Sequence, residues 1–242
     1  MIKLEHTDVY GFEAAIRGMR NPMNSWDKSD SCELDCKLFP CDGCAFEQLC
    51  EERYPRAYEV GENDLALMRK LAHAGDDHGK FGRFITVTVD ITAPLYWWKE
   101  FDTYKVGTVS NSCSTMHKIH EKEFVLDNFS HEHLVGNFVF NCDEIGFHSD
   151  DRILVEPLSE LKRTIQTLNY CRKAYVETKS KMYWWQLIQL LPSSYNQRRT
   201  VQLNYQVLNR IYHARKNHKL DEWHEFCDWI EKLPYFKQIY LD

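Results

Sequence analysis

The stretch Ile85-Thr86-Val87-Thr88-Val89-Asp90-Ile91-Thr92, followed directly by Ala93-Pro94-Leu95, decides the fold expected for this chain. Apolar and polar side chains alternate from 85 to 92 and most are β-branched, which is typical of a strand with one buried face. Pro94 suits the first turn of a helix, and Leu95, Trp98 and Phe101 then recur at every third position. The sequence therefore predicts a strand that runs straight into a helix.

Further helices and strands are expected on both sides of this stretch. A helix should be capped by Asn63 or Asp64 and end at Gly75. Two more short strands are predicted at 134–140 and 152–156. The last third of the chain is predicted as helices that begin at Pro157 and cover about 183–191, 195–216 and 221–232. Strands followed by packed helices indicate an α+β fold.

The composition excludes several classes of protein. The chain has 242 residues, 43% of them hydrophobic, with only 10 Gly and 7 Pro, so it can bury one core and is not disordered over long stretches. A net charge of -6 gives little support to a general role in coating nucleic-acid duplexes. No apolar run approaches the roughly 18 residues of a membrane span, and no signal-peptide pattern opens the chain. A cytoplasmic protein is expected.

A segment at about 21–60, rich in Pro, Asp, Ser and Cys, is expected to be an insertion into a single domain that covers 1–242. It carries five cysteines, which are Cys32, Cys36, Cys41, Cys44 and Cys50. Two of them, Cys41 and Cys44, form a Cys-x-x-Cys pair that can bind one tetrahedral ion. Cys32 and Cys36 would complete four thiolates, with Cys50 as a substitute. A structural zinc site is favoured, and an iron–sulfur cluster or free thiols are the alternatives.

Basic residues gather near the end of the helix predicted at 195–216. They are Arg210, His213, Arg215, Lys216, His218 and Lys219. Helical spacing puts Asn204 and Arg215 on nearly one face, roughly 16 Å apart, so a ligand that touches both must be at least as large as a nucleotide. Arg215 suits phosphate because its planar fork binds two oxygens. The alternative is that these cations only offset the helix macrodipole.

Aromatic and hydroxyl side chains fill the segment that follows Pro94. Aromatic rings can stack on a flat heterocycle, and Lys105 can offset phosphate charge. Hydrogen bonds to a base or sugar can come from Thr108, Ser110, Asn111 and Ser114. For Trp98 and Phe101, burial in the core is the favoured interpretation.

The order of these segments resembles the flavin-dependent thymidylate synthase family over most of the chain. Ala15-Ile16-Arg17 resembles the family's early Ala-Ala-Arg, and Leu65 to Phe81 resembles its helix and His-Gly-His-Glu-x-Pro-Phe turn. Phe84 through Ala93-Pro94 to Ser114 resembles its strand, Ala-Pro step and signature helix. Leu191-Pro192, Asn204 and Arg215 lie at the spacing of the family's Leu-Pro, its Asn and its nucleotide-contacting Arg.

The resemblance implies an α+β fold with a small, mostly antiparallel sheet packed with helices. It also implies a homotetramer that binds FAD and methylates dUMP at C5, with methylenetetrahydrofolate and NADPH as co-substrates. The implied substrate-binding residues are Arg215, Arg17 and Asn111, and the implied cofactor-binding residues are Asn204, Lys105, Thr103, Thr108 and His78. The alternatives are a non-catalytic nucleotide-binding protein on the same scaffold and a purely structural oligomer.

The signature itself departs from the family pattern. Thr103-Tyr104-Lys105 stands where the family has Arg-His-Arg, so one of two cations is lost, although Tyr104 could still stack on a ring. The acidic residue after the Pro-Phe turn becomes Gly82 or Arg83, and the Arg two residues after the Asn becomes Gln206.

A cysteine falls on a serine position of the signature. Cys113 aligns with the family's later Ser, and Ser114 is adjacent. A thiolate can add to C6 of a pyrimidine and activate C5, which makes Cys113, Ser114 and Tyr104 the candidate catalytic residues. The alternative for Cys113 is a buried, inert thiol.

Overall fold

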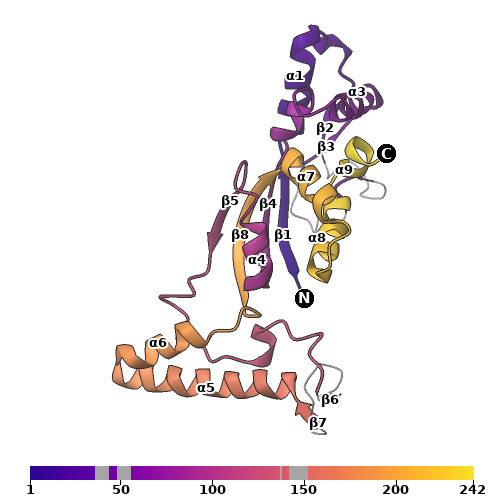
Figure 1. Cartoon of the computed structure of the whole chain (residues 1–242). Helices are drawn as coiled ribbons and strands as arrows, with labels where there is room; N and C mark the ends of the chain where they lie inside the picture. Colours follow the sequence, from indigo (N-terminus) through magenta and orange to yellow (C-terminus); the bar gives the residue numbers. More distant parts are fainter. Residues whose placement is uncertain (36–43, 48–55, 137, 142–151) are drawn as a thin grey trace. The chain divides into compact units, whose positions relative to one another are not determined.

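The computed structural model describes residues 1–35, 44–47, 56–136, 138–141 and 152–242 (Figure 1). The chain divides into two compact units, which are described separately. The sheet unit comprises Ile2–Thr92, Glu100–Asn111 and Arg198–Asp242, and the helical unit comprises Met1, Ala93–Lys99 and Ser112–Gln197. The single domain expected across 1–242 stays a prediction.

A four-stranded sheet in the order β1-β4-β8-β5 lies mainly in the sheet unit. Its strands are β1 (Lys3–Tyr10), β4 (Thr86–Pro94), β8 (Asn196–Asn204) and β5 (Val109–Ser112). β1 runs antiparallel to β4, with a register shift between Glu5 and Asp8. In β4, Val87, Val89 and Ile91 are fully buried and alternate with half-buried residues, which confirms the predicted strand.

The prediction of one helix across 195–216 is wrong in its first half. Residues 196–204 form strand β8, and only Tyr205–Arg215 form helix α7. Val201 and Leu203 are buried and alternate with exposed residues, which is the two-residue period of a strand. On the exposed face, Arg198 and Thr200 both bind the carboxylate of Asp90 in β4, and Arg198 does so at 2.6 Å. The strand is therefore stabilised by a partner more than a hundred residues earlier in the chain.

Helices, short 3₁₀ turns and one hairpin complete the sheet unit. The helices are α1 (Phe12–Arg20), α3 (Glu62–His73), α7, α8 (Asp221–Glu231) and α9 (Phe236–Tyr240), and α4 (Leu95–Phe101) ends in this unit. The hairpin is β2 (Cys32–Asp35) with β3 (Arg56–Glu59), and the 3₁₀ turns are η1 (Asn21–Met23), η2 (Trp26–Lys28) and η3 (Gly79–Arg83). Aromatic side chains dominate the core, among them Phe101, Tyr205 and Trp223. The expected burial of Phe101 is thus confirmed.

The helical unit centres on two helices that pack along each other, α5 (Pro157–Thr178) and α6 (Lys181–Leu190) (Figure 1). As predicted, α5 begins at Pro157. The core includes Phe124, Phe129, Leu168 and Leu187. The unit also contains the 3₁₀ turn η4 (Leu126–Asn128) and the antiparallel pair β6 (Phe138–Asn141) and β7 (Arg152–Val155), close to the two strands expected there. Trp98 is buried here, as expected.

None of the helices in the described ranges combines the length and the apolar character that a membrane-spanning segment requires.

The start of α3 differs from the prediction that Asn63 or Asp64 caps it. Gly61 is the N-cap, and the carboxylate of Asp30 accepts hydrogen bonds from the backbone N–H of Asn63 at 2.8 Å and of Asp64 at 3.1 Å. A Cβ on Gly61 would lie 2.3 Å from Cγ of Asp30, so only glycine leaves room for this contact. The cap comes from a residue about thirty positions earlier, which local spacing does not reveal.

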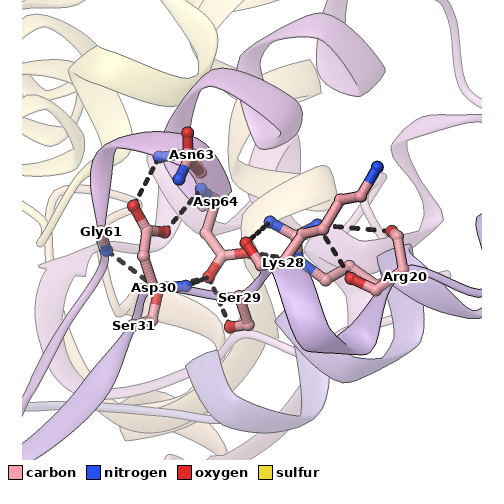
Figure 2. Close-up of polar contacts among 9 residues, drawn as sticks. Arg20, Lys28, Ser29, Asp30, Ser31, Gly61, Asn63 and Asp64 are labelled. Atoms are coloured by element: carbon pink, nitrogen blue, oxygen red, sulfur yellow. Dashed lines mark hydrogen bonds and ion pairs between the residues drawn. The ribbon is translucent and has the colours of Figure 1, made fainter.

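The side chain of Asp64 instead forms a buried ion pair with Arg20 (Figure 2). Nε of Arg20 lies 2.6 Å from Oδ1 of Asp64, and both side chains are almost completely buried. Oδ2 of Asp64 accepts hydrogen bonds from the hydroxyls of Ser29 at 2.6 Å and Ser31 at 2.7 Å, and from the backbone N–H of Asp30.

These contacts set the charge state of Asp64 and the path of the chain. Burial acts to raise the pKa of Asp64, but hydrogen bonds from Ser29, Ser31 and Arg20 outweigh it and leave the pKa below its usual value. Asp64 is therefore ionised at neutral pH. Its contacts attach residues 20–31 to the start of α3.

Replacing Arg20 with methionine should lower the free energy of unfolding by about 3 kcal/mol, because it leaves the carboxylate of Asp64 buried and unpaired. Urea denaturation at pH 7 measures the loss. Since the pKa of Asp64 is lowered in the folded protein, the stabilisation is present above the ordinary aspartate pKa and is lost as the pH falls through the folded value.

Arg17 provides the matched control on the same helix. Its ion pair with Glu13 is exposed, so Arg17→Met should change stability by less than about 0.5 kcal/mol. Equal effects of the two substitutions would contradict a structural role for the buried pair.

Candidate functional site

The C-terminal end of α7 meets the segment that follows α4. Nε of Arg215 donates to the hydroxyl of Tyr104 at 2.8 Å, and Nη1 donates to Oε2 of Glu100 at 2.6 Å. The guanidinium carbon lies 5.5 Å from the ring centroid of Tyr104 and 4.7 Å from that of Trp223. The basic end of α7 and the segment that follows α4 are therefore in contact within the sheet unit.

Glu100 is the centre of this arrangement. Besides Arg215, its Oε2 accepts a hydrogen bond from Nε1 of Trp223 at 3.1 Å, and Nε2 of His218 lies 3.2 Å from the same oxygen. The backbone N–H of Leu220 donates to Nδ1 of His218, so a neutral His218 carries its proton on Nε2. These five side chains, Glu100, Tyr104, Arg215, His218 and Trp223, are called the Arg215 cluster below.

Sequence analysis did not identify Glu100 or Trp223 as site residues. The sequence did offer one signal for Glu100, which is a carboxylate inside the aromatic-rich run 97–101. Trp223 carried no signal of its own, because its place in the cluster depends on how α8 returns toward α7.

Arg215 has hydrogen-bonding capacity left over. A guanidinium carries five N–H groups, and the described residues provide acceptors for two of them, Tyr104 and Glu100. The side chain is 18% exposed. The remaining N–H groups can bind an oxyanion, while cation–π contacts with Tyr104 and Trp223 help to hold the guanidinium in place.

The other end of α7 forms a second polar region. Asn204 caps the helix rather than lying within it, and its Oδ1 accepts the backbone N–H of Val207 at 3.0 Å. Gly107 has φ +78, and a Cβ there would lie 3.1 Å from Nδ2 of Asn204. Within the described part of the chain, neither Nδ2 of Asn204 nor the buried Oγ1 of Thr108 has a hydrogen-bond partner. The predicted cofactor-binding residues Asn204 and Thr108 thus have the unmet polar groups that a bound polar cofactor would satisfy.

Two departures from the family pattern contact each other. Nε of Arg83 donates to Oε1 of the buried Gln206, and Nε2 of Gln206 donates to Oδ1 of Asp76 at 3.3 Å. Arg210 completes the network by pairing with Asp76. Hydrogen bonds from Arg210 and Gln206 hold the pKa of Asp76 below its usual value. The turn after α3 is thereby joined to α7 by a network of polar side chains.

The remaining predicted substrate and cofactor residues lie on the surface of the sheet unit. Thr103 donates its hydroxyl to the backbone oxygen of Glu100 at 2.7 Å. Arg17 pairs with Glu13 on α1. The other three, Lys105, His78 and Asn111, are exposed. Their roles in binding stay predictions.

Cys113 and Ser114 belong to the helical unit, not to the unit of the Arg215 cluster. Cys113 is an exposed free thiol, so the alternative of a buried thiol is wrong. The hydroxyl of Ser114 accepts the backbone N–H groups of Met116 at 3.3 Å and His117 at 2.9 Å, which forms a turn. Their catalytic roles stay predictions.

The predicted metal site lies largely outside the described residues. Cys36, Cys41 and Cys50 fall there, whereas Cys32 is an exposed free thiol and Cys44 a half-buried one. Within the ranges that the structure describes, no three Cys, His, Asp or Glu residues are grouped to hold a metal ion. The zinc site stays a prediction.

Comparison with known proteins identifies relatives in structure alone. No family model and no curated protein matches the sequence. The structure is similar to the flavin-dependent thymidylate synthase ThyX from Helicobacter pylori complexed with FAD and dUMP, with a TM-score of 0.61, 15% identity, and coverage of 100% of this chain and 98% of that chain. It is also similar to the UMP/dUMP methylase PolB from Streptomyces cacaoi bound with 5-Br dUMP, with a TM-score of 0.57, 12% identity, and coverage of 98% and 93%. The chain therefore has the α+β fold of these proteins, as the resemblance implied.

Proposed function

We propose that this protein binds a pyrimidine nucleotide such as dUMP at the Arg215 cluster and methylates its base at C5. The observation that carries the proposal is the guanidinium of Arg215, which Glu100 and Tyr104 orient while three of its N–H groups have no acceptor among the described residues. A phosphate can accept from two of these groups at once. The shared fold with two proteins crystallised with dUMP or its bromo analogue supports this choice of ligand.

FAD is the proposed cofactor, because the polar groups around Gly107 fit it. Nδ2 of Asn204 and Oγ1 of Thr108 have unmet hydrogen bonds, and Lys105, three positions before Thr108 in the sequence, supplies a positive charge. Thr103 and His78 complete the proposed set of cofactor-binding residues. When bound, FAD supplies the reducing equivalents, with methylenetetrahydrofolate as carbon donor and NADPH as electron source. The proposed assembly is a homotetramer.

The remaining residues are assigned by their chemistry. Arg17 and Asn111 would add contacts to the substrate, and Tyr104 would stack beside it. Cys113 is the proposed nucleophile, because a thiolate that bonds to C6 of a pyrimidine shifts the ring electrons to C5. Ser114 would position Cys113, its neighbour in the chain, through the turn that its hydroxyl forms with the backbone of His117.

A non-catalytic nucleotide-binding protein is the second candidate. Glu100 neutralises Arg215, and Thr103 has replaced a cation of the signature, so the site carries less positive charge than the family pattern implies. Such a protein would bind the nucleotide without FAD.

The purified protein should be yellow or should take up added FAD, because an oxidised flavin absorbs visible light. Flavin fluorescence during an FAD titration measures binding. Riboflavin, which lacks the nucleotide part of FAD, is the control, and weaker binding of riboflavin would show that the site requires that part. A colourless protein that takes up no FAD but binds dUMP would support the second candidate.

Replacing Arg215 with alanine should weaken dUMP binding by about tenfold or more, because charge-assisted hydrogen bonds to the phosphate are lost. Isothermal titration calorimetry measures the dissociation constant. Lys216→Ala is the matched control, since Lys216 is the next residue, is exposed and packs over Tyr212. Unchanged binding by Arg215→Ala would end the phosphate assignment.

Replacing Glu100 with glutamine should strengthen dUMP binding by about fivefold, because it removes a negative charge beside the phosphate. The same change should leave the affinity for deoxyuridine unaltered, since the nucleoside has no phosphate. An equal change for both ligands would show that Glu100 acts on the base or sugar instead.

A further inference from the structure

A second pocket lies in the sheet unit, beside the buried Arg20–Asp64 pair. It is an open pocket of about 520 Å³, within the size range of small-molecule sites. Its lining residues are Arg20, Met23, Ser25, Lys28, Asn63 and Leu67. They come from the end of α1, from the 3₁₀ turns η1 and η2 with Ser25 between them, and from the first two turns of α3. None of them belongs to the Arg215 cluster.

The buried arginine of this pocket has one donor to spare. Nε of Arg20 donates to Asp64, Nη1 donates to the backbone oxygen and the hydroxyl of Ser25, and Nη2 donates to the backbone oxygen of Lys28 at 3.0 Å. These contacts use four of its five N–H groups. In the described part of the chain the second N–H of Nη2 has no acceptor, so a ligand oxygen in the pocket would satisfy it.

Two further polar groups at the pocket are unpaired. The amine of Lys28 and the side-chain amide of Asn63 make no hydrogen bond or ion pair with the residues that the structure describes (Figure 2). Lys28 extends away from the Asp64 carboxylate (Figure 2). The nearby carboxylate of Asp30 is already engaged by the backbone N–H groups of Asn63 and Asp64. Three polar donors from separate segments therefore surround the same space.

The charges and the apolar walls define the class of ligand. The unpaired groups of Arg20 and Lys28 are cationic N–H donors, and the amide of Asn63 adds a neutral one, so the pocket offers donors that match the oxygens of a carboxylate. Met23 and Leu67 supply apolar surface in the same pocket, and Met23 is exposed. We propose that this pocket binds a small monocarboxylate with an apolar body. Its carboxylate contacts Arg20, Lys28 and Asn63, and its apolar part packs on Met23 and Leu67.

Methyl NMR of the full chain tests this proposal. The chain has six methionines, and with 13C-labelled methionine methyls the Met23 signal reports on the pocket, while Met116 and Met182 of the other unit serve as internal references. The probe is 4-phenylbutanoate, compared with 4-phenylbutan-1-ol and with inorganic phosphate. We expect saturable movement of the Met23 signal with the carboxylate, and binding about tenfold weaker for the alcohol, because a charge-assisted contact is lost.

Substitution of Lys28 tests the charge without disturbing the buried pair. Lys28→Gln should weaken 4-phenylbutanoate binding by about fivefold, which is near the upper end of what one exposed ion pair contributes. Lys70→Gln, an exposed lysine of α3 outside the pocket, is the matched control and should bind as the parent does. The proposal is overturned if the Met23 signal does not move, if the alcohol or phosphate binds as tightly as the carboxylate, or if the two lysine variants behave alike.

Discussion

One oxygen of Glu100 accepts hydrogen bonds from Arg215 and Trp223 and lies 3.2 Å from Nε2 of His218, and the site depends on these contacts. They join the end of α4 to α7, to the turn after α7 and to α8. A guanidinium that is mostly buried requires a partner charge, because an unpaired buried charge is strongly destabilising. Glu100 therefore keeps the basic end of α7 folded against the aromatic segment and orients Arg215 before any ligand arrives.

The Arg20–Asp64 pair and the Arg215–Glu100 pair of the sheet unit differ in how fully their hydrogen-bonding groups are satisfied. Asp64 accepts from Arg20, Ser29, Ser31 and the backbone of Asp30, so its carboxylate is saturated and its role is structural. The Glu100 pair leaves three N–H groups of its arginine without an acceptor among the described residues. Arg20 keeps one such N–H group, so the number of unmet hydrogen bonds, rather than burial, sets how many contacts each arginine can offer a ligand.

The α+β fold is shared with proteins that are only 12–15% identical to this chain. Within it, Arg83 and Gln206 lie far apart in the sequence but are hydrogen-bonded to each other, and Asp76 and Arg210 extend the same network. These side chains join the turn after α3 to α7.

The sequence by itself determined the features that depend on neighbouring residues. The alternation of 85–92 specified β4, and proline placement specified the start of α5 at Pro157. Motif order indicated the α+β fold and brought Tyr104 and Arg215 into one candidate site. Tertiary structure alone decided that residues 196–204 form a strand, that Asp30 caps α3, and that Glu100 pairs with Arg215. Each of these depends on a partner distant along the chain, and local periodicity carries no information about a contact that only folding creates.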